Sequence, residues 1–465
     1  MSNSTDTQNA TVVSRGLSPV RRVLANGATI IAKESRATPA VTIHASLRAG
    51  TVYDPATLPG LSHFVSRTVD RGTTTRSADD IAELLDARGV SLSVLVNRHA
   101  LSLVCTCLVE DYQVVMALLA EILQSATFPE AEVETRRGEI ITLIRQDEDN
   151  PATVAAEGLM SMLYGAEHPY GRPTRGTVDS VQRIDAAALR AFHASRCRPQ
   201  FLSLVVVGDL ECTRAIDVAA ETLVEWKREG GAGAKAPAHE QASTCEQAPA
   251  YEHAPARAAV PEDFSWLAVP PVPPARRVQV VPMMNKAQTD IAYGFTSITR
   301  SDPAFFACTL MNNILGQYSL GGRLGDSIRE RQGMAYYVSS GMDASVIPGP
   351  LMIRAGVSPD NVRRAVASID EELSRMAADG PTEEELAESR QYLIGSMPRN
   401  LETNLGIATY LQMMEFFGLG LDYDLRVPGL LRAVTLDQVH AAARRVLDTS
   451  RAAIVVAGPF DGSLT

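Results

Sequence analysis

Residues 54–67 read Asp-Pro-Ala-Thr-Leu-Pro-Gly-Leu-Ser-His-Phe-Val-Ser-Arg, and they begin a pattern that the chain uses twice. Aspartate before proline is a common start of a helix, because the carboxylate accepts hydrogen bonds from free backbone N–H groups and proline fits the first turn. Asp302-Pro303-Ala304 repeats this start in the second half of the chain. We therefore predict one helical stretch from Asp54 through His63 and another from Phe305 to Leu315.

After these helices, the two halves continue through the same series of elements. With the N-terminal half given first, the matched elements are a short helix at 78–87 and 325–332, a glycine at 89 and 333, a strand pair at 91–108 and 335–356, a long helix at 112–125 and 360–377, a charged helix from 130 and 383, an amphipathic helix at 185–195 and 435–447, and an apolar strand at 202–208 and 452–458. Such repetition indicates two copies of one module of about a domain's size.

The fold class that we predict is α+β, with two homologous α/β-sandwich modules, each a mixed sheet covered by helices. The segment between them is rich in Pro, Ala and Gly, which is typical of an extended linker. The predicted division is a flexible N-terminus at 1–18, an N-terminal module at 19–228, a linker at 229–275, a C-terminal module at 276–460 and a tail at 461–465.

Composition narrows the classes of partner. The chain has 465 residues, 45% of them hydrophobic, and its 54 acidic against 43 basic residues give a net charge of -11. This balance argues against nucleic acid or an anionic membrane surface as the main partner. The polar N-terminal residues do not form a secretory signal, and no apolar run reaches the length of a membrane span. We expect a cytoplasmic protein.

His63 lies where a zinc-binding motif, His-x-x-Glu-His, would place its first histidine. In that motif, residues at i and i+4 share one face of a helix, so two imidazoles bind Zn²⁺ while the glutamate acts as general base on the bound water. Here Ser66 stands in the place of the base and Arg67 in the place of the second ligand. Since a guanidinium stays protonated and repels a divalent cation, we expect no zinc at this position.

Together, the duplicated module and the degenerate motif resemble the pitrilysin/insulinase family of inverzincin peptidases, and in particular its bacterial branch of processing-peptidase-like proteins. The resemblance extends from Val20 to Gly458. It includes three short strings, Asn26-Gly27 before Ile30-Ile31, Gly50-Thr51-Val52-Tyr53-Asp54, and Asn285-Lys286-Ala287-Gln288-Thr289. The resemblance implies that the two modules form one half of a clamshell around a chamber.

A more specific part of the resemblance is an arginine and a tyrosine at Arg329 and Tyr336, within Ile328–Tyr336. In the family this pair hydrogen-bonds the backbone of the substrate and helps to stabilise the oxyanion, a role that suits well-placed donors. From spacing alone, another interpretation stays open. Arg329 would then belong to a solvated charged face, and Tyr336 would be an ordinary aromatic residue of a strand.

The family's third zinc ligand, a glutamate on a later helix, falls on residues 141–145 of this chain. Thr142 and Leu143 occupy the relevant places, so the resemblance implies that this ligand is missing as well. Glu139 lies one turn earlier and would be the only candidate for a shifted ligand. One imidazole and one carboxylate fall short of the three protein ligands of a catalytic zinc site, so we expect no metal in this chain.

In the family's heterodimers, one chain carries the intact zinc motif and the other supplies the arginine and the tyrosine. This chain is similar to the second kind. We expect it to bind no cofactor and to be inactive alone, with zinc in a homologous partner of similar size and an extended peptide as substrate. Two alternatives stay open, namely a non-proteolytic structural or peptide-binding subunit and, least favoured, a protease whose metal site the sequence does not reveal.

Overall fold

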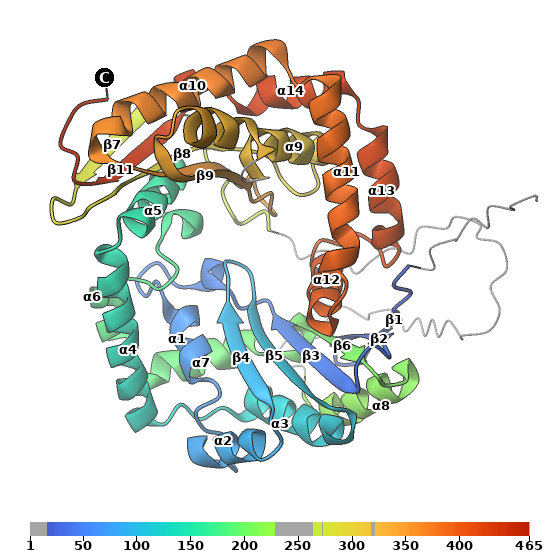
Figure 1. Cartoon of the computed structure of the whole chain (residues 1–465). Coiled ribbons are helices and arrows are strands. Elements are labelled where there is room, and N and C mark those ends of the chain that lie inside the picture. Colours follow the sequence, from blue (N-terminus) through green and yellow to red (C-terminus); the bar gives the residue numbers. More distant parts are fainter. Residues whose placement is uncertain (1–15, 228–263, 272, 318–320, 465) are drawn as a thin grey trace, which may run out of the picture.

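The N-terminal module is built on a mixed sheet of six strands in the order β1-β2-β6-β3-β5-β4 (Figure 1). The computed structural model describes residues 16–227, 264–271, 273–317 and 321–464. β2 and β6 run parallel, whereas the other neighbours are antiparallel. The strands are β1 Val20–Val23, β2 Thr29–Glu34, β3 Ala40–Leu47, β4 Ser91–Val96, β5 Leu101–Leu108 and β6 Leu202–Gly208.

The C-terminal module repeats this sheet without the first strand. Its five strands lie in the order β7-β11-β8-β10-β9, which matches β2-β6-β3-β5-β4 position by position. The parallel pair recurs as β7 and β11. The predicted α+β class with two homologous modules is therefore confirmed. The strands are β7 Arg277–Pro282, β8 Thr289–Thr296, β9 Ala335–Met342, β10 Pro350–Val357 and β11 Ala453–Gly458.

Helices follow the same order in both modules. Those of the first are α1 Leu61–Thr68, α2 Ala78–Asp86, α3 Tyr112–Ser125, α4 Glu130–Glu148, α5 Pro151–Tyr164, α6 Val178–Arg183, α7 Ala186–Arg196 and α8 Cys212–Leu223. Those of the second are α9 Phe305–Asn312, the π-helices η5 Asn313–Gln317 and η7 Gly325–Arg331, α10 Val362–Asp379, α11 Glu383–Asn400, α12 Asn404–Phe416, α13 Tyr423–Ala433 and α14 Leu436–Val446. Within the described ranges, none of the helices is both long and apolar enough to span a membrane.

The first helix begins later than the sequence predicts. A 3-10 turn, Thr51–Tyr53, precedes Asp54, and α1 begins only at Leu61. Asp54 still caps the helix, because its carboxylate accepts hydrogen bonds from the backbone N–H groups of Gly60 and Ser62, both at 2.8 Å. The intervening residues form a loop that ends at Gly60, where the positive φ of 91° favours glycine.

The predicted linker at 229–275 lies mostly outside the described residues. The part of it that is described, 264–271 and 273–275, lies outside the helices and strands.

One helix of each module packs on the sheet of the other module. α5 contacts β8 and β11, whereas α12 contacts β6 and β3. Leu159 of α5 is fully buried in a cluster with Val455 of β11. From α12, the side-chain amide of Gln412 donates to the backbone carbonyl groups of His44 (2.7 Å) and Ser203 (2.9 Å). The two modules therefore share their cores through reciprocal contacts.

We predict that Leu159→Ala lowers the free energy of unfolding by about 2–5 kcal/mol, because it removes buried contacts and leaves a cavity. Leu159 belongs by sequence to the first module and by packing to the sheet of the second, so unfolding should remain one transition. Denaturant unfolding followed by circular dichroism measures the free energy of unfolding and shows the number of transitions. Leu405→Ala on α12 is the control, since Leu405 is 49% exposed and should lose little. Two separate transitions, of which the substitution shifts only one, would contradict this prediction.

Candidate functional site

Helix α1 places His63 beside positive charge. The Nε2 atom of His63 is buried and has no hydrogen-bond partner among the described residues. Burial lowers the pKa of His63 to about 4, and the charges of Arg175 and Arg67 act in the same direction. The imidazole is therefore neutral near pH 7, the form that can bind a metal.

The other two positions of the motif offer no ligand. The hydroxyl group of Ser66 donates to the carbonyl oxygen of His63 at 2.7 Å, one turn back on its own helix. The guanidinium of Arg67 pairs with Glu139 of α4, with an N–O distance of 3.4 Å. Arg136 also hydrogen-bonds Glu139, and these two arginines, Arg136 first, hold the pKa of the Glu139 carboxyl below its usual range.

Leu143, half-buried on α4, supplies no ligating atom. In the described ranges, no group of three or more His, Cys, Asp and Glu side chains is placed to hold a metal ion. The residues around His63 do not fit Zn²⁺, since the carboxylate nearest to Arg67 is already neutralised by two guanidinium groups. That this chain works without zinc stays a prediction.

Arg329 and Tyr336 lie on consecutive elements at one end of the second sheet. Arg329 is in the last turn of η7, and Tyr336 is near the start of β9, which is an edge strand. Two backbone hydrogen bonds close the turn between them. The N–H of Gly333 donates to the carbonyl oxygen of Arg329 (3.0 Å), and the N–H of Met334 donates to that of Ile328 (3.1 Å). This turn ties the arginine and the tyrosine into one local unit.

Tyr336 is the extra residue of a β-bulge. Ala335 pairs with Val357 and Tyr337 with Gly356, so Tyr336 has no partner on β10. Bulges redirect side chains, and they are frequent next to active sites. The Tyr336 side chain is 65% exposed, whereas the hydroxyl of the adjacent Tyr337 is hydrogen-bonded to Asp290. Of the two tyrosines, Tyr336 is the one free to contact a ligand.

Arg329 is held only loosely. Its Nε lies 3.8 Å from Glu330, and the side chain is 42% exposed. Arg331, on the same helix, instead pairs with Asp326 at 3.0 Å. A long exposed side chain with one weak partner can turn toward a ligand at little cost.

The first module uses the equivalent positions for packing. Gly89 and Gly333 have the same φ of 61°, so the two turns can be aligned on these glycines. Counted from these glycines, Arg329 and Tyr336 correspond to Leu85 and Leu92, which pack against the core of the first module. At these two positions, among the described residues, the second module carries polar donors where the first carries leucines.

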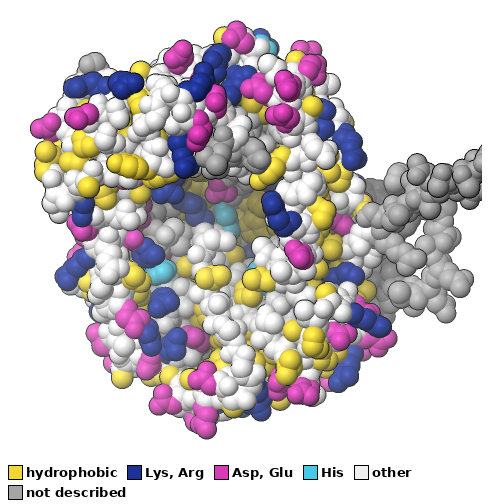
Figure 2. Space-filling view, viewed as in Figure 1, with side chains coloured by type: hydrophobic (Ala, Val, Ile, Leu, Met, Phe, Trp, Pro, Cys, Tyr) yellow, Lys and Arg dark blue, Asp and Glu magenta, His cyan; other side chains and the backbone are white. Residues whose placement is uncertain are grey.

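A cleft of about 490 Å³ lies between the two modules. Its walls come from α5 and the 172–174 loop of the first module and from β9 and β10 of the second. Figure 2 shows the hollow between the modules, with Lys and Arg side chains in dark blue on its wall. Sequence reasoning missed this cleft, because Arg98 and Arg354, which line it, belong to no motif and meet only through the packing of the modules.

Three buried polar side chains, His99, Tyr170 and Ser345, form a hydrogen-bonded joint between the two modules. The Nε2 of His99 lies 2.6 Å from the hydroxyl of Tyr170 and 3.0 Å from that of Ser345. His99 and Tyr170 belong to the first module, whereas Ser345 lies in the β9–β10 loop of the second. Burial lowers the pKa of His99 to about 4, so the joint depends on a neutral imidazole.

The duplicated sheets and the exchanged helices define a class of two-module α/β proteins. The chain belongs to the insulinase family of peptidases. The model described as "Insulinase (Peptidase family M16)" matches residues 29–178, and the model described as "Peptidase M16 inactive domain" matches residues 183–393.

Relatives of similar length match nearly the whole chain. It is 24% identical to an uncharacterized zinc protease of Mycobacterium leprae, over 96% of this chain and 93% of the relative. It is 23% identical to the uncharacterized zinc protease YmxG of Bacillus subtilis, over 90% and 94% of the two chains.

Solved structures share the fold. A peptidase M16 inactive domain from Pseudomonas fluorescens has a TM-score of 0.83 at 24% identity, covering 96% of this chain and 99% of that one. A protease from Helicobacter pylori has a TM-score of 0.80 at 15% identity, covering 94% and 99%.

We predict that acid weakens the fold through His99. Its pKa is lower in the folded state than the unfolded value of 6.5, so the unfolded chain binds the proton more tightly. Stability is then present above pH 6.5 and is lost as the pH falls toward 4, by about 2 kcal/mol per such histidine between pH 7 and pH 5. Denaturant unfolding of native protein and of His99→Gln at both pH values measures this loss. An equal loss of stability in the two proteins would refute the assignment to His99.

Proposed function

We propose that this chain is the non-catalytic, substrate-binding subunit of a heterodimeric zinc metallopeptidase that cleaves unfolded or extended peptides. The observation that carries the proposal is the contrast between its two modules. The first has Arg67 paired with Glu139 where a metal would bind. The second presents an exposed Tyr336 on a bulge, one turn after the loosely held Arg329.

In this proposal a homologous partner subunit holds the Zn²⁺, which activates the attacking water. This chain holds the peptide in position and supplies the positive charge of Arg329. An extended peptide adds along a sheet edge in the chamber between the subunits, where backbone hydrogen bonds hold it. Arg329 and Tyr336 donate hydrogen bonds to the peptide near the scissile bond and stabilise the negative charge that develops on its carbonyl oxygen.

We predict that Arg329→Ala and Tyr336→Phe each lower kcat/KM of the assembled pair on the order of 10²-fold, the usual effect of removing one oxyanion donor. Size-exclusion chromatography should show that both variants still assemble, because neither side chain is buried. Arg331→Ala is the matched control from the same helix, since Arg331 already pairs with Asp326. Full activity in both variants would sink the proposal.

We further predict that the native chain binds no zinc, whereas the triple variant Ser66→Glu, Arg67→His, Leu143→Glu binds one ion. α1 packs against α4, and the 3.4 Å contact of Arg67 with Glu139 shows that side chains of the two helices meet there. Arg67→Ala, which removes the charge without adding a ligand, is the control and should stay free of zinc. Native mass spectrometry counts the ions. One zinc on the native chain would overturn our interpretation of His63, Ser66 and Arg67.

A second candidate function is a structural or peptide-binding subunit without proteolysis. The absence of a metal-ligand group from the described residues is equally compatible with it. Isolation of the chain from its native cells distinguishes the two. A second subunit of similar size with one zinc per pair supports the peptidase, whereas a metal-free complex without peptidase activity supports the structural role.

A further inference from the structure

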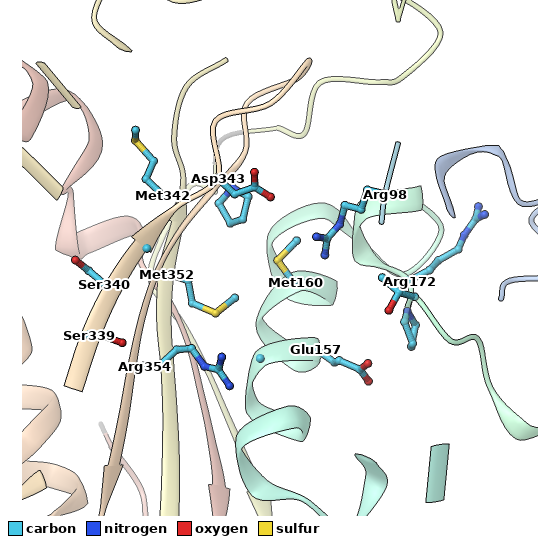
Figure 3. A pocket seen from close by; sticks show the side chains of 15 residues that line it. Arg98, Glu157, Met160, Arg172, Ser339, Ser340, Met342, Asp343, Met352 and Arg354 are labelled. Carbon is cyan, nitrogen blue, oxygen red and sulfur yellow. The ribbon is translucent and has the colours of Figure 1, made fainter. Parts of the chain in front are cut away.

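The cleft between the modules combines an apolar floor with arginines on its walls. Met160 of α5 and Met352 of β10 lie between Arg98 and Arg354, which reach toward the cleft from different modules (Figure 3). Methionine side chains adapt to varied apolar surfaces, and guanidinium groups match the geometry of carboxylates. The cleft therefore has the composition of a site for a mixed ligand, apolar with an anionic group.

Arg98 lies on an ordered turn, and its Nε has no acceptor among the described residues. It lies in the β4–β5 turn, where the side-chain oxygen of Asn97 accepts from the N–H groups of His99 and Ala100, both at 2.8 Å. Its guanidinium lies 5.4 Å from the ring centroid of Tyr170. The Nε of Arg98 is buried and finds no hydrogen-bond partner in the described part of the chain. A buried N–H without an acceptor is costly, so the surroundings of Arg98 leave part of its hydrogen-bonding capacity unused.

Arg354 is open to the cleft. It lies on β10, where it pairs with Ser339 of β9 and Ala292 of β8, and its own side chain is exposed. Within the described ranges it forms no ion pair. Arg323, near η7, is by contrast paired with a carboxylate, since its Nε lies 2.6 Å from Glu385.

The other charged groups of the cleft leave these two arginines available. The guanidinium of Arg172 is engaged by the backbone carbonyl groups of Glu167 and Asp54. Glu157 and Asp343 line the cleft, but neither forms an ion pair with Arg98 or Arg354 among the described contacts. Three arginines, Arg98, Arg172 and Arg354, line the cleft against the two acidic residues Glu157 and Asp343, so positive charge is in excess there.

We propose that this cleft binds a carboxylate of the extended peptide on the exposed guanidinium of Arg354, with neighbouring apolar side chains on Met160 and Met352 and with Arg98 adding positive charge on the opposite side. The proposal rests on the proposed function and names its substrate class, namely peptides with a carboxylate at a set position. The carboxylate is either an Asp or Glu side chain or the free C-terminus of the peptide. Both forms offer two oxygens to a guanidinium.

The test measures binding of fluorescent peptides to the full chain by anisotropy, without a partner subunit. Three unstructured peptides differ only in charge, the first with internal glutamates and an amidated C-terminus, the second with glutamines and a free C-terminus, and the third with glutamines and an amidated C-terminus. We expect the third peptide to bind on the order of tenfold more weakly than at least one of the others. The peptide that binds more tightly identifies the source of the carboxylate. Equal binding of all three would overturn the proposal.

Arg354→Gln should remove this preference by weakening only the charged peptide, since Arg354 is exposed and its loss leaves the core intact. Arg98→Gln should act in the same direction, and a thermal melt reports whether it still folds. Arg444→Gln is the matched control, because Arg444 is exposed on α14 and its substitution changes the net charge equally. A similar loss in the control would assign the preference to overall charge and refute the site. Turnover by the Arg329 and Tyr336 variants tests the proposed function separately, since these residues do not line the cleft.

Discussion

Helix α5 of the first module packs on the sheet of the second module, and α12 of the second packs on the sheet of the first. The rest of the molecule depends on this reciprocal contact. Each helix is continuous with one module and buried against the other, so neither sheet has a complete core of its own. Each helix also covers only part of its sheet. Ser91, Ser93 and Leu95 of β4 stay exposed, as does Arg354 of β10. The same packing that joins the modules therefore leaves parts of both sheets exposed.

The two faces of α1 have different roles in the fold. α1 buries Phe64 and Val65, whereas His63 and Arg67 lie on its more accessible side. Substitution on that side costs little packing energy. The ion pair between Arg67 and Glu139 then supplies, from within the protein, the positive charge that a cation would otherwise bring to this position. The packing of α1 and the charge pair of Arg67 thus use different faces of one short helix.

Much of the architecture could be predicted from residue patterns. Hydrophobic periodicity and capping signals locate most helices and strands, and a capping box of Thr382 and Glu385 begins α11 where the sequence predicts a charged helix. The start of α1 was misplaced because Asp54 caps it across a loop rather than from the adjacent residue. The exchange of α5 and α12 could not be predicted from the sequence, since periodicity shows that a helix has a buried face but not which sheet covers it. Arg98 and Arg354 were missed for the same reason.

The placement of Arg98 and Arg354 in different modules has a mechanical consequence. A rotation of one module against the other would change the distance between the two guanidinium groups, whereas a site within one module would be insensitive to it. The exchanged helices and the joint of His99, Tyr170 and Ser345 resist such a rotation. The span between the two guanidinium groups is thus set by the packing of both modules together and by neither module alone.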